Sequence, residues 1–568
     1  PRSTLFPYTT LFRSVYANYR HTFGEDHNFS AMIGYENYWY QEGTIVAKNT
    51  SYAHSLIPDL NAGNSDGVTA NSKNINELAR RSYFGRLMYN YKSKYYVQGN
   101  IRRDGSSRFA PDCRWGTFLS ASAGWVFTEE KFMEGARKVL DHGKLRLSYG
   151  ELGNERIKGY YPYQAVLANN HTMGYVGSTL TGLSGYAQAA AIVTDITWET
   201  TSTFDVGVDL SLFRNRLSVT GDWYYKKTRD MLLQVNIATI MGLSDPYDNI
   251  GDMHTKGWEI TLSWKDEFQL AGSPFSYNMS ASVGDYITKI TKYHNPDRLI
   301  SDHYVGKTLG EIWGYHVEGL FKTDREAAEY QASIDDKAVN NRVYQCKGPA
   351  GNYLRAGDVR FADLDGDNVI SEGSGTVDDP GDKRIIGNSL PRYNYSFRVG
   401  FNWMGFDVSA FFQGIGRRDW YPAAGQASYD FWGPYAFPPT SFIHKDFYAD
   451  CWSEDNRNAY FPRPRGYNAY AGGSLGEKND RYLQNLAYLR LKNLTIGYTV
   501  PQKLTRKIGI DRARVYFSGE NLCYWSPLKR HNKTIDPELA GSGSTNKADS
   551  GTGYAYPKTL SVGVDISF

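Results

Sequence analysis

The chain ends in a stretch in which every second residue is apolar, and this alternation constrains the fold more than any other feature of the sequence. The apolar positions are Leu560, Val562, Val564, Ile566 and Phe568, and the residues between them are Ser561, Gly563, Asp565 and Ser567. Successive side chains of a β-strand point to opposite faces of the sheet, so this strand has one apolar and one polar face. Half-buried strands of soluble sandwiches share the pattern, so its recurrence decides the interpretation.

The alternation recurs along the whole chain. It is clearest in residues 204–212, 217–225, 258–264, 275–284, 393–403, 406–412 and 494–500. The polar positions of these strands carry Asp, Arg and Asn, where a soluble sandwich would often place a second apolar layer. An apolar outer face and a polar inner face are typical of an outer-membrane barrel. The sequence therefore predicts an all-β fold, an antiparallel transmembrane β-barrel in the outer membrane with its apolar face against the lipid bilayer.

The connections between strands differ in length. Residues 92–94 and 213–216 fit tight turns, whereas residues 41–80, 289–391 and 415–485 fit long loops. Short periplasmic turns on one side and long extracellular loops on the other describe a barrel. We expect few helices beyond a short one near residues 129–140.

Composition excludes several classes of protein. The 568 residues contain no apolar run long enough for a transmembrane helix, and the 45 Tyr and 13 Trp suit membrane interfaces and a polar lumen. A net charge of +3, without a compact basic and aromatic module, gives no reason to expect nucleic acid as a partner. The four cysteines lie far apart, which argues against a zinc site or a disulfide framework; they are Cys113, Cys346, Cys451 and Cys523.

The first residues have a different character from the rest. The segment Thr4–Ser14 looks like the translation of a common sequencing adaptor, and it has no signal-peptide pattern. We therefore expect residues 1–14 to be non-native and adaptor-derived, and residues 15–568 to form the barrel with its long extracellular loops.

Seven groups of short motifs are spaced along nearly all of the chain after Ser14. They lie at residues 99–109, 114–118, 145–154, 249–259, 386–393, 489–494 and 516–522; the first reads Gly-Asn-Ile-Arg-Arg-Asp-Gly-Ser-Ser-Arg-Phe. In this order they resemble the SusC/RagA-like branch of TonB-dependent outer-membrane transporters. Each motif alone is weak, and their ordered sum carries the resemblance.

The resemblance implies a barrel of about 22 strands, of which this chain supplies about fifteen as the C-terminal portion. It also implies a plug domain and a TonB-interacting box encoded before the barrel, so we expect both to be absent from these residues. The implied function is active import of oligomeric nutrients, glycan or peptide, energised through the TonB complex. The implied partner is a SusD-like surface lipoprotein that captures the substrate.

Two other functions stay open from the sequence. One is a passive porin-like or structural outer-membrane barrel, and the other is a soluble extracellular β-rich binding protein. We predict no enzymatic activity, because the sequence has no nucleophile elbow, no zinc-protease motif and no phosphate-cradling loop.

An acidic stretch offers a candidate calcium site. Asp363, Asp365 and Asp367 occupy positions 1, 3 and 5 of a calcium-loop pattern, a spacing that lets carboxylates surround one hard cation. Asn368 replaces the usual Gly at position 6, and Ser374 replaces the bidentate Glu at position 12. Glu372, Asp378, Asp379 or Asp382 could replace that Glu after a rearrangement of the loop. The alternative is a solvated acidic loop without a cation.

The long loop after residue 415 offers a candidate binding surface. It is rich in aromatic residues, and we predict that Trp420, Tyr421, Trp432 and Tyr435 bind the substrate or the partner. The alternative is that these rings pack an ordered loop or form the aromatic girdle. At the end of the chain, Phe568 resembles the terminal aromatic that outer-membrane barrels present to the barrel-assembly machinery, so we predict that it is an assembly signal.

Overall fold

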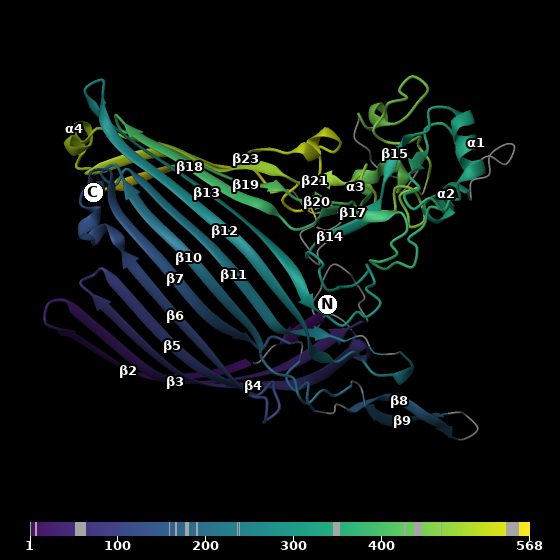
Figure 1. The fold of residues 1–568 in the computed structure, drawn as a ribbon, viewed down its shortest axis with the longest axis horizontal. Helices are drawn as coiled ribbons and strands as arrows, with labels where there is room; N and C mark the ends of the chain where they lie inside the picture. The colour runs from purple at the N-terminus through teal and green to yellow at the C-terminus, as the bar shows by residue number, and fades with distance from the viewer. Residues whose placement is uncertain are drawn as a thin grey trace.

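The computed structural model describes all residues except 1, 6–7, 51–63, 158, 165–166, 177–180, 189–190, 236, 238, 345–352, 425–427, 437–445, 467 and 541–555. Its main element is a curved, antiparallel sheet of sixteen strands (Figure 1). The sheet begins at β1 and β2, which both pair with β3, and it ends at β24. Within the described residues no pairing joins these two edges, so the sheet is an open part of a barrel.

The strands of this sheet follow one another in chain order. They are β1 (Arg2–Leu5), β2 (Tyr8–Phe23), β3 (His27–Asn49), β4 (Val68–Tyr91), β5 (Tyr95–Ser106), β6 (Trp115–Val126), β7 (Leu140–Asn154), β10 (Glu199–Leu212), β11 (Leu217–Gln234), β12 (Tyr247–Leu270), β13 (Ser273–Lys292), β18 (Arg392–Trp403), β19 (Phe406–Arg417), β22 (Tyr488–Thr499), β23 (Arg512–Trp525) and β24 (Thr559–Ser567).

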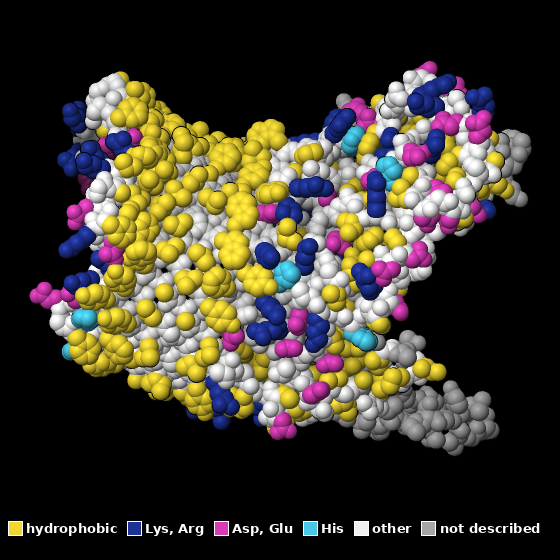
Figure 2. Space-filling view, in the orientation of Figure 1, with side chains coloured by type: hydrophobic (Ala, Val, Ile, Leu, Met, Phe, Trp, Pro, Cys, Tyr) yellow, Lys and Arg dark blue, Asp and Glu magenta, His cyan; other side chains and the backbone are white. Residues whose placement is uncertain are grey.

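The two faces of the sheet differ as the alternation predicts. On one face of β7, β10 and β11, the residues Leu147, Val206 and Trp223 lie side by side. One position further along, Asp205 pairs with Tyr224 on the other face. Figure 2 shows hydrophobic side chains spread over one face of the strands. These observations confirm the predicted all-β, antiparallel, barrel-type fold.

The tight turns are where the sequence predicts them. Between β4 and β5, Lys92 and Ser93 both have φ of 53°, and the turn between β10 and β11 places Phe213 to Asn215 at φ of 58–62°. Two successive residues with positive φ form the turn whose twist matches antiparallel strands. All short connections lie at the same end of the sheet, which we call the turn end (Figure 1).

One of the three predicted long loops is wrong. Most of residues 41–80 belongs to strands, because β3 and β4 continue their pairing from Gln41–Glu77 to Asn49–Val68. The loop predictions for residues 289–391 and 415–485 are confirmed, since β18 follows β13 after a long excursion and β22 follows β19 in the same way. Residues 2–5 and 8–13 pair as strand with β3, and their origin in an adaptor stays a prediction.

The long connections contain their own short elements. These are β8 (Leu167–Val176), β9 (Thr181–Gln188), β14 (Glu311–Tyr315), β15 (Val317–Leu320), α1 (Asp324–Ser333), α2 (Lys337–Tyr344), β16 (Val359–Phe361), β17 (Lys383–Asn388), β20 (Asp419–Trp420), α3 (Tyr429–Trp432) and β21 (Gln484–Asn485). Short 3-10 turns occur at Ser65–Gly67, Thr239–Met241, Gly433–Tyr435, Phe447–Asp450 and Pro527–Arg530.

The helix prediction is only partly right. The stretch near residues 129–140 forms three separate 3-10 turns, η3 (Phe127–Glu129), η4 (Lys131–Met133) and η5 (Ala136–Lys138), and the two longest α-helices, α1 and α2, lie instead in the loop after β13. At the turn end, α4 (Gln502–Thr505) continues into η11 (Arg506–Ile508). Among the described residues, no helix has both the length and the apolar character needed to cross a membrane.

Aromatic rings pack closely over a glycine at the end of the sheet opposite the turn end. Phe118 is buried with Phe109 and Trp198, and the ring centroids of Phe118 and Trp198 lie 5.6 Å apart. The Phe118 ring also covers Gly153 of β7, where an added Cβ would lie 2.0 Å from the ring. Any side chain at Gly153 therefore displaces this cluster.

We predict that Gly153→Ala destabilises the folded barrel by about 1–3 kcal/mol, since overpacking forces the Phe118 ring out of its place. The matched control is Gly99→Ala, because nothing lies within 4 Å of a Cβ added there. The measurement is the temperature at which the full-length protein loses its folded migration in detergent gels. Equal transition temperatures for the two variants would contradict the packing argument.

Candidate functional site

Three long connections pack together as one globular body beyond the end of the sheet. It comprises the described parts of residues 293–391, 418–487 and 526–540, and we call it the loop body (Figure 1). Its core is aromatic, with Phe431, Trp432, Tyr435, Phe461 and Tyr482 almost fully buried. The membrane sheet has no comparable core, so the loop body is stabilised by the hydrophobic effect in the way a soluble domain is.

Ion pairs attach the loop body to the strands. Arg490 of β22 is 1% exposed; it pairs with Asp536 and lies 3.1 Å from Glu538, both in the last long connection. Within the loop body, Arg465 binds Asp358 through two contacts of 2.8 and 2.6 Å. A buried charge that loses its partner is costly, so these pairs fix how the connections lie against one another.

The structure corrects the prediction of a binding surface for three of the four loop aromatics, Trp420, Trp432 and Tyr435. Trp432 and Tyr435 have no exposed surface and Trp420 is 6% exposed. Their polar groups are bound inside the loop body: Trp432 Nε1 donates to the Ala423 carbonyl at 3.2 Å, and Tyr435 Oη donates to the Pro462 carbonyl at 2.6 Å. Tyr421 is partly buried, and its hydroxyl donates to the Glu477 carbonyl at 2.8 Å. A side chain with little or no exposed surface offers a partner nothing to touch, so Trp420, Trp432 and Tyr435 are packing groups, whereas a binding role for Tyr421 stays a prediction.

The acidic turn brings three carboxylates together, but they are not the three that the sequence predicts. Oxygen atoms of Asp363, Asp365 and Asp382 lie within 4.8 Å of one another, and Asp367 is not among them. The Asp367 carboxylate instead accepts the Val369 amide at 2.7 Å. Asp382 takes its place as a buried residue from a later part of the loop.

Backbone hydrogen bonds shape this turn. Asp363 accepts the Gly366 amide at 2.7 Å and the Asn368 amide at 3.0 Å, which curls the chain around its carboxylate. Asn368 has φ of 66°, the left-handed conformation that Asn tolerates in place of Gly. Asp382 is held by the Leu364 amide at 2.5 Å and the Ser371 amide at 2.9 Å.

The electrostatics of the turn suit a cation. Burial, and after it the repulsion of Asp365 and Asp363, raise the pKa of the Asp382 carboxyl above its usual value. Oxygen ligands from several carboxylates are the donors that Ca²⁺ takes in proteins. Calcium binding stays a prediction, now with Asp363, Asp365 and Asp382 as its ligands.

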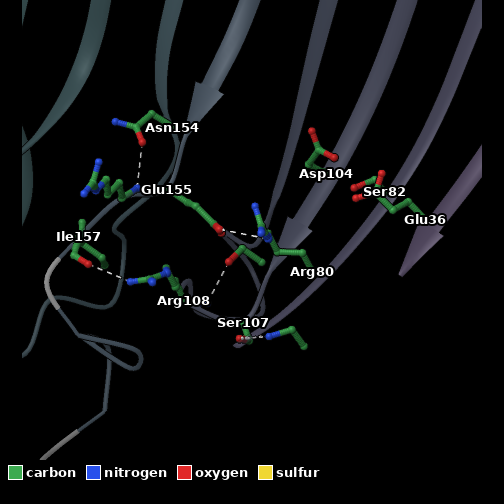
Figure 3. A network of polar contacts seen from close by, with 12 residues as sticks. Glu36, Arg80, Ser82, Asp104, Ser107, Arg108, Asn154, Glu155 and Ile157 are labelled. Atoms are coloured by element: carbon green, nitrogen blue, oxygen red, sulfur yellow. Dashed lines mark hydrogen bonds and ion pairs between the residues drawn. The ribbon is translucent and has the colours of Figure 1, made fainter. Parts of the chain in front are cut away.

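The first sequence motif supplies a polar network on the inner face of the sheet (Figure 3). Arg102 of β5 contacts Asp104 at 2.9 Å, Ser82 Oγ at 2.9 Å and Glu36 at 3.7 Å, which joins β3, β4 and β5. Close by, Arg80 lies 3.5 Å from Glu155. The motif therefore has a structural role, as a set of cross-strand contacts on the polar wall.

Further along the same polar wall, charged pairs repeat. Arg146 lies 2.7 Å from Asp209 and 2.8 Å from Asp222, and Arg514 lies 2.6 Å from Asp407 and 3.2 Å from Asp565. Charges of this density on one face need water around them, which a polar barrel lumen provides.

A hollow of about 480 Å³ lies on this wall where β11, β12, β13, β18 and β19 meet. Its lining combines the rings of Tyr224, Tyr286 and Phe411 with the polar groups of Glu259 and Gln413. The ring of Tyr224 lies over Gly257, where an added Cβ would be 2.4 Å from it. Sequence reasoning missed this site, although aromatic residues at the polar positions of the alternation are the signal that marks it.

Comparison with known proteins gives one family. The family model described as "TonB dependent receptor-like, beta-barrel" matches residues 2–522. The "TonB-dependent receptor P3" of Formosa agariphila is 26% identical over 585 residues, covering 99% of this chain and 52% of that protein. The "TonB-dependent receptor SusC" of Bacteroides thetaiotaomicron is 27% identical over 493 residues, covering 86% of this chain and 43% of that protein. The chain therefore spans about half the length of the curated relatives it matches.

Solved structures agree on the fold. The structure of the RagAB peptide transporter is similar with a TM-score of 0.73 and 22% identity, covering 100% of this chain and 56% of that chain. The RagAB peptide importer in its "closed-closed" state is similar with a TM-score of 0.75 and 23% identity, again over 100% of this chain and 56% of that chain.

We predict that calcium binds the full-length protein and that replacing Asp363, Asp365 and Asp382 together with Asn lowers the affinity at least about tenfold, because each removed carboxylate removes an anionic ligand. Isothermal titration with calcium measures this. Affinity should fall as the pH falls, since protons compete for Asp382, whose pKa is raised.

The matched control for the calcium prediction is Asp367→Asn, which should leave the affinity unchanged because Asp367 lies outside the convergent group. Loss of affinity in this control as large as in the triple variant would restore Asp367 as a ligand, as the sequence predicts. Absence of any heat with the native protein would leave the acidic turn as a solvated loop.

Proposed function

Because the chain belongs to the family of TonB-dependent receptor-like β-barrels, we propose that it forms the C-terminal part of the wall of an outer-membrane importer of oligomeric nutrients, energised through TonB. The family is one of outer-membrane proteins, and the apolar face of the sheet lies against the bilayer. The observation that carries the proposal is the family match over residues 2–522, joined to a polar inner wall that bears an aromatic hollow.

The substrate class follows from the chemistry of the lumenal hollow. Aromatic faces beside carboxylate and amide groups bind the flat apolar faces and the polar edges of sugars, and they also bind peptide side chains. Tyr224, Tyr286 and Phe411 supply the rings, and Glu259 and Gln413 supply the polar groups. A glycan or a peptide is therefore the proposed cargo, and the family match gives no reason to propose enzymatic activity.

A SusD-like surface lipoprotein is the proposed partner. The similar proteins support this pairing, since they include the TonB-dependent receptor SusC and the RagAB peptide transporter. The loop body is the part of the chain available for such contact, because it extends beyond the sheet on the side opposite the turn end (Figure 1). Its buried aromatics give the body its shape, and exposed residues on it would make the contact.

The test of import uses cells that carry the full-length gene or lack it. Uptake of labelled oligosaccharides and peptides should depend on the gene and should stop when an uncoupler dissipates the proton-motive force. Replacing Tyr224 and Tyr286 with Ala should lower uptake roughly tenfold, through loss of two aromatic contacts. Phe204→Ala, on the outer face of β10, is the control that should leave uptake unchanged.

Uptake that continues in the presence of the uncoupler would identify a passive porin instead. Unchanged uptake in the Tyr224 and Tyr286 variant, with the barrel folded, would remove the hollow from the substrate path while leaving energised import intact.

The test of the partner distinguishes residues that contact the lipoprotein from residues that pack the loop body. Tyr448 is 58% exposed and follows the buried Phe447, so its ring is available on the surface of the loop body. We expect Tyr448→Ala to weaken co-purification of the lipoprotein without changing proteolysis of the loops. Trp432→Ala should cost about 3–5 kcal/mol of local stability, as removal of a fully buried ring does, and should expose the loops to protease. Unchanged co-purification in both variants would contradict a lid bound through this part of the loop body.

A further inference from the structure

The connection between β22 and β23 differs from the tight turns of the sheet. Where β12 meets β13, and where β18 meets β19, tight turns centred on Gly272 and Gly405 suffice. Between β22 and β23, residues 501–511 form a helical segment made of α4 and η11, closed by Gly509 at φ of 75°. Thr505 is buried, and its carbonyl accepts the Ile510 amide at 3.1 Å.

The segment exposes apolar residues that water does not favour. Leu504 is 57% exposed and Ile508 is 73% exposed. Leu504 belongs to α4 and Ile508 to η11, so each part of the segment exposes one large aliphatic side chain. Two large exposed aliphatic side chains on so short a segment fit a surface that another apolar phase covers.

Three other exposed positions of the segment are basic. Lys503, Arg506 and Lys507 are all exposed. Arg506 lies 3.8 Å from Asp511, and neither lysine forms an ion pair within the described part of the chain. The segment therefore combines an apolar pair with three cationic side chains, of which two lack an acidic partner in the protein.

Its position is at the membrane boundary on the turn end. The Asp511 amide donates to the Ser567 carbonyl at 2.9 Å, so the segment lies against the last strand, as Figure 1 shows for α4 and the end of the chain. There the lipid-facing residues Ile566 and Phe568 are exposed. Figure 2 shows basic side chains along this edge, beside the hydrophobic face of the strands. Short turns of an outer-membrane barrel face the periplasm, so the bilayer beside them is the periplasmic leaflet.

We propose that residues 501–511 form an interfacial anchor that binds anionic phospholipids of the periplasmic leaflet. Leu504 and Ile508 enter the region of the acyl chains, while Lys503, Arg506 and Lys507 reach the phosphate groups. Amphipathic helices with this division of residues lie in the plane of the interface, and each basic residue near the surface adds attraction to anionic lipid. Anionic headgroups fit better than zwitterionic ones, because no ammonium group of the lipid competes with the lysines.

The experiment places a polarity-sensitive NBD probe on Leu504→Cys in the full-length protein, with its native cysteines replaced by Ser, in phosphatidylcholine nanodiscs. Nitroxide-labelled phosphatidylglycerol or nitroxide-labelled phosphatidylcholine is then added as the quencher. We expect phosphatidylglycerol to quench at a mole fraction about tenfold lower than phosphatidylcholine, and we expect the triple variant Lys503→Gln, Arg506→Gln and Lys507→Gln to lose this preference.

The matched control removes the same charge from the opposite side of the membrane. Lys322→Gln, Arg325→Gln and Lys337→Gln change three exposed basic residues of the loop body and should leave the lipid preference intact. Equal quenching by the two lipids in the native sequence overturns the proposal, as does a probe that neither lipid quenches, which would place the segment in water or against a protein. Failure of this test leaves the import proposal untouched, because import is measured separately.

Discussion

The hydrogen-bonded antiparallel ladder is the constraint on which the rest of this structure depends. Hydrocarbon offers no partner to a backbone N–H or C=O group, so a strand that crosses a bilayer must pair along its full length. The pairing of β12 with β13 runs from Asp252–Lys292 to Leu270–Ser273, and most other neighbours pair as continuously. The outer edges at β2 and β24 are the exception, and such edges require further strands in a membrane.

Once the ladder is fixed, each side chain is assigned to lipid or to lumen by its position alone. Val206 and Trp223 share the lipid face, while Asp205 and Tyr224, one position away, share the lumen face. The lumen face is polar enough to need charge pairs such as Arg146 with Asp209 and Asp222. The hollow around Tyr224 and Tyr286 combines aromatic rings with charged groups on this wall, and for this reason we propose it as a cargo site.

The loop body obeys a different balance of forces. It is surrounded by water, so it folds around its own aromatic core, with Trp432, Tyr435 and Phe461 at the centre. Trp432 and Tyr435, which the sequence predicts as part of a binding surface, belong to this core. A long loop needs such buried apolar area to hold one conformation. At the opposite end, segment 501–511 needs no such core, since the membrane interface itself covers Leu504 and Ile508.

The sequence by itself determined the class of fold, the two faces of the sheet and the tight turns at residues 92–94 and 213–216, because these depend on a period of two and on local backbone conformation. The family resemblance was also visible, as an ordered set of motifs. Only the tertiary structure decided that Asp382 joins Asp363 and Asp365 in place of Asp367, and that Trp420, Trp432 and Tyr435 are buried. It also decided that Tyr224 of β11 and Phe411 of β19 line one hollow, although three strands lie between them. These arrangements depend on contacts between residues far apart in the chain, for which the local pattern carries no signal.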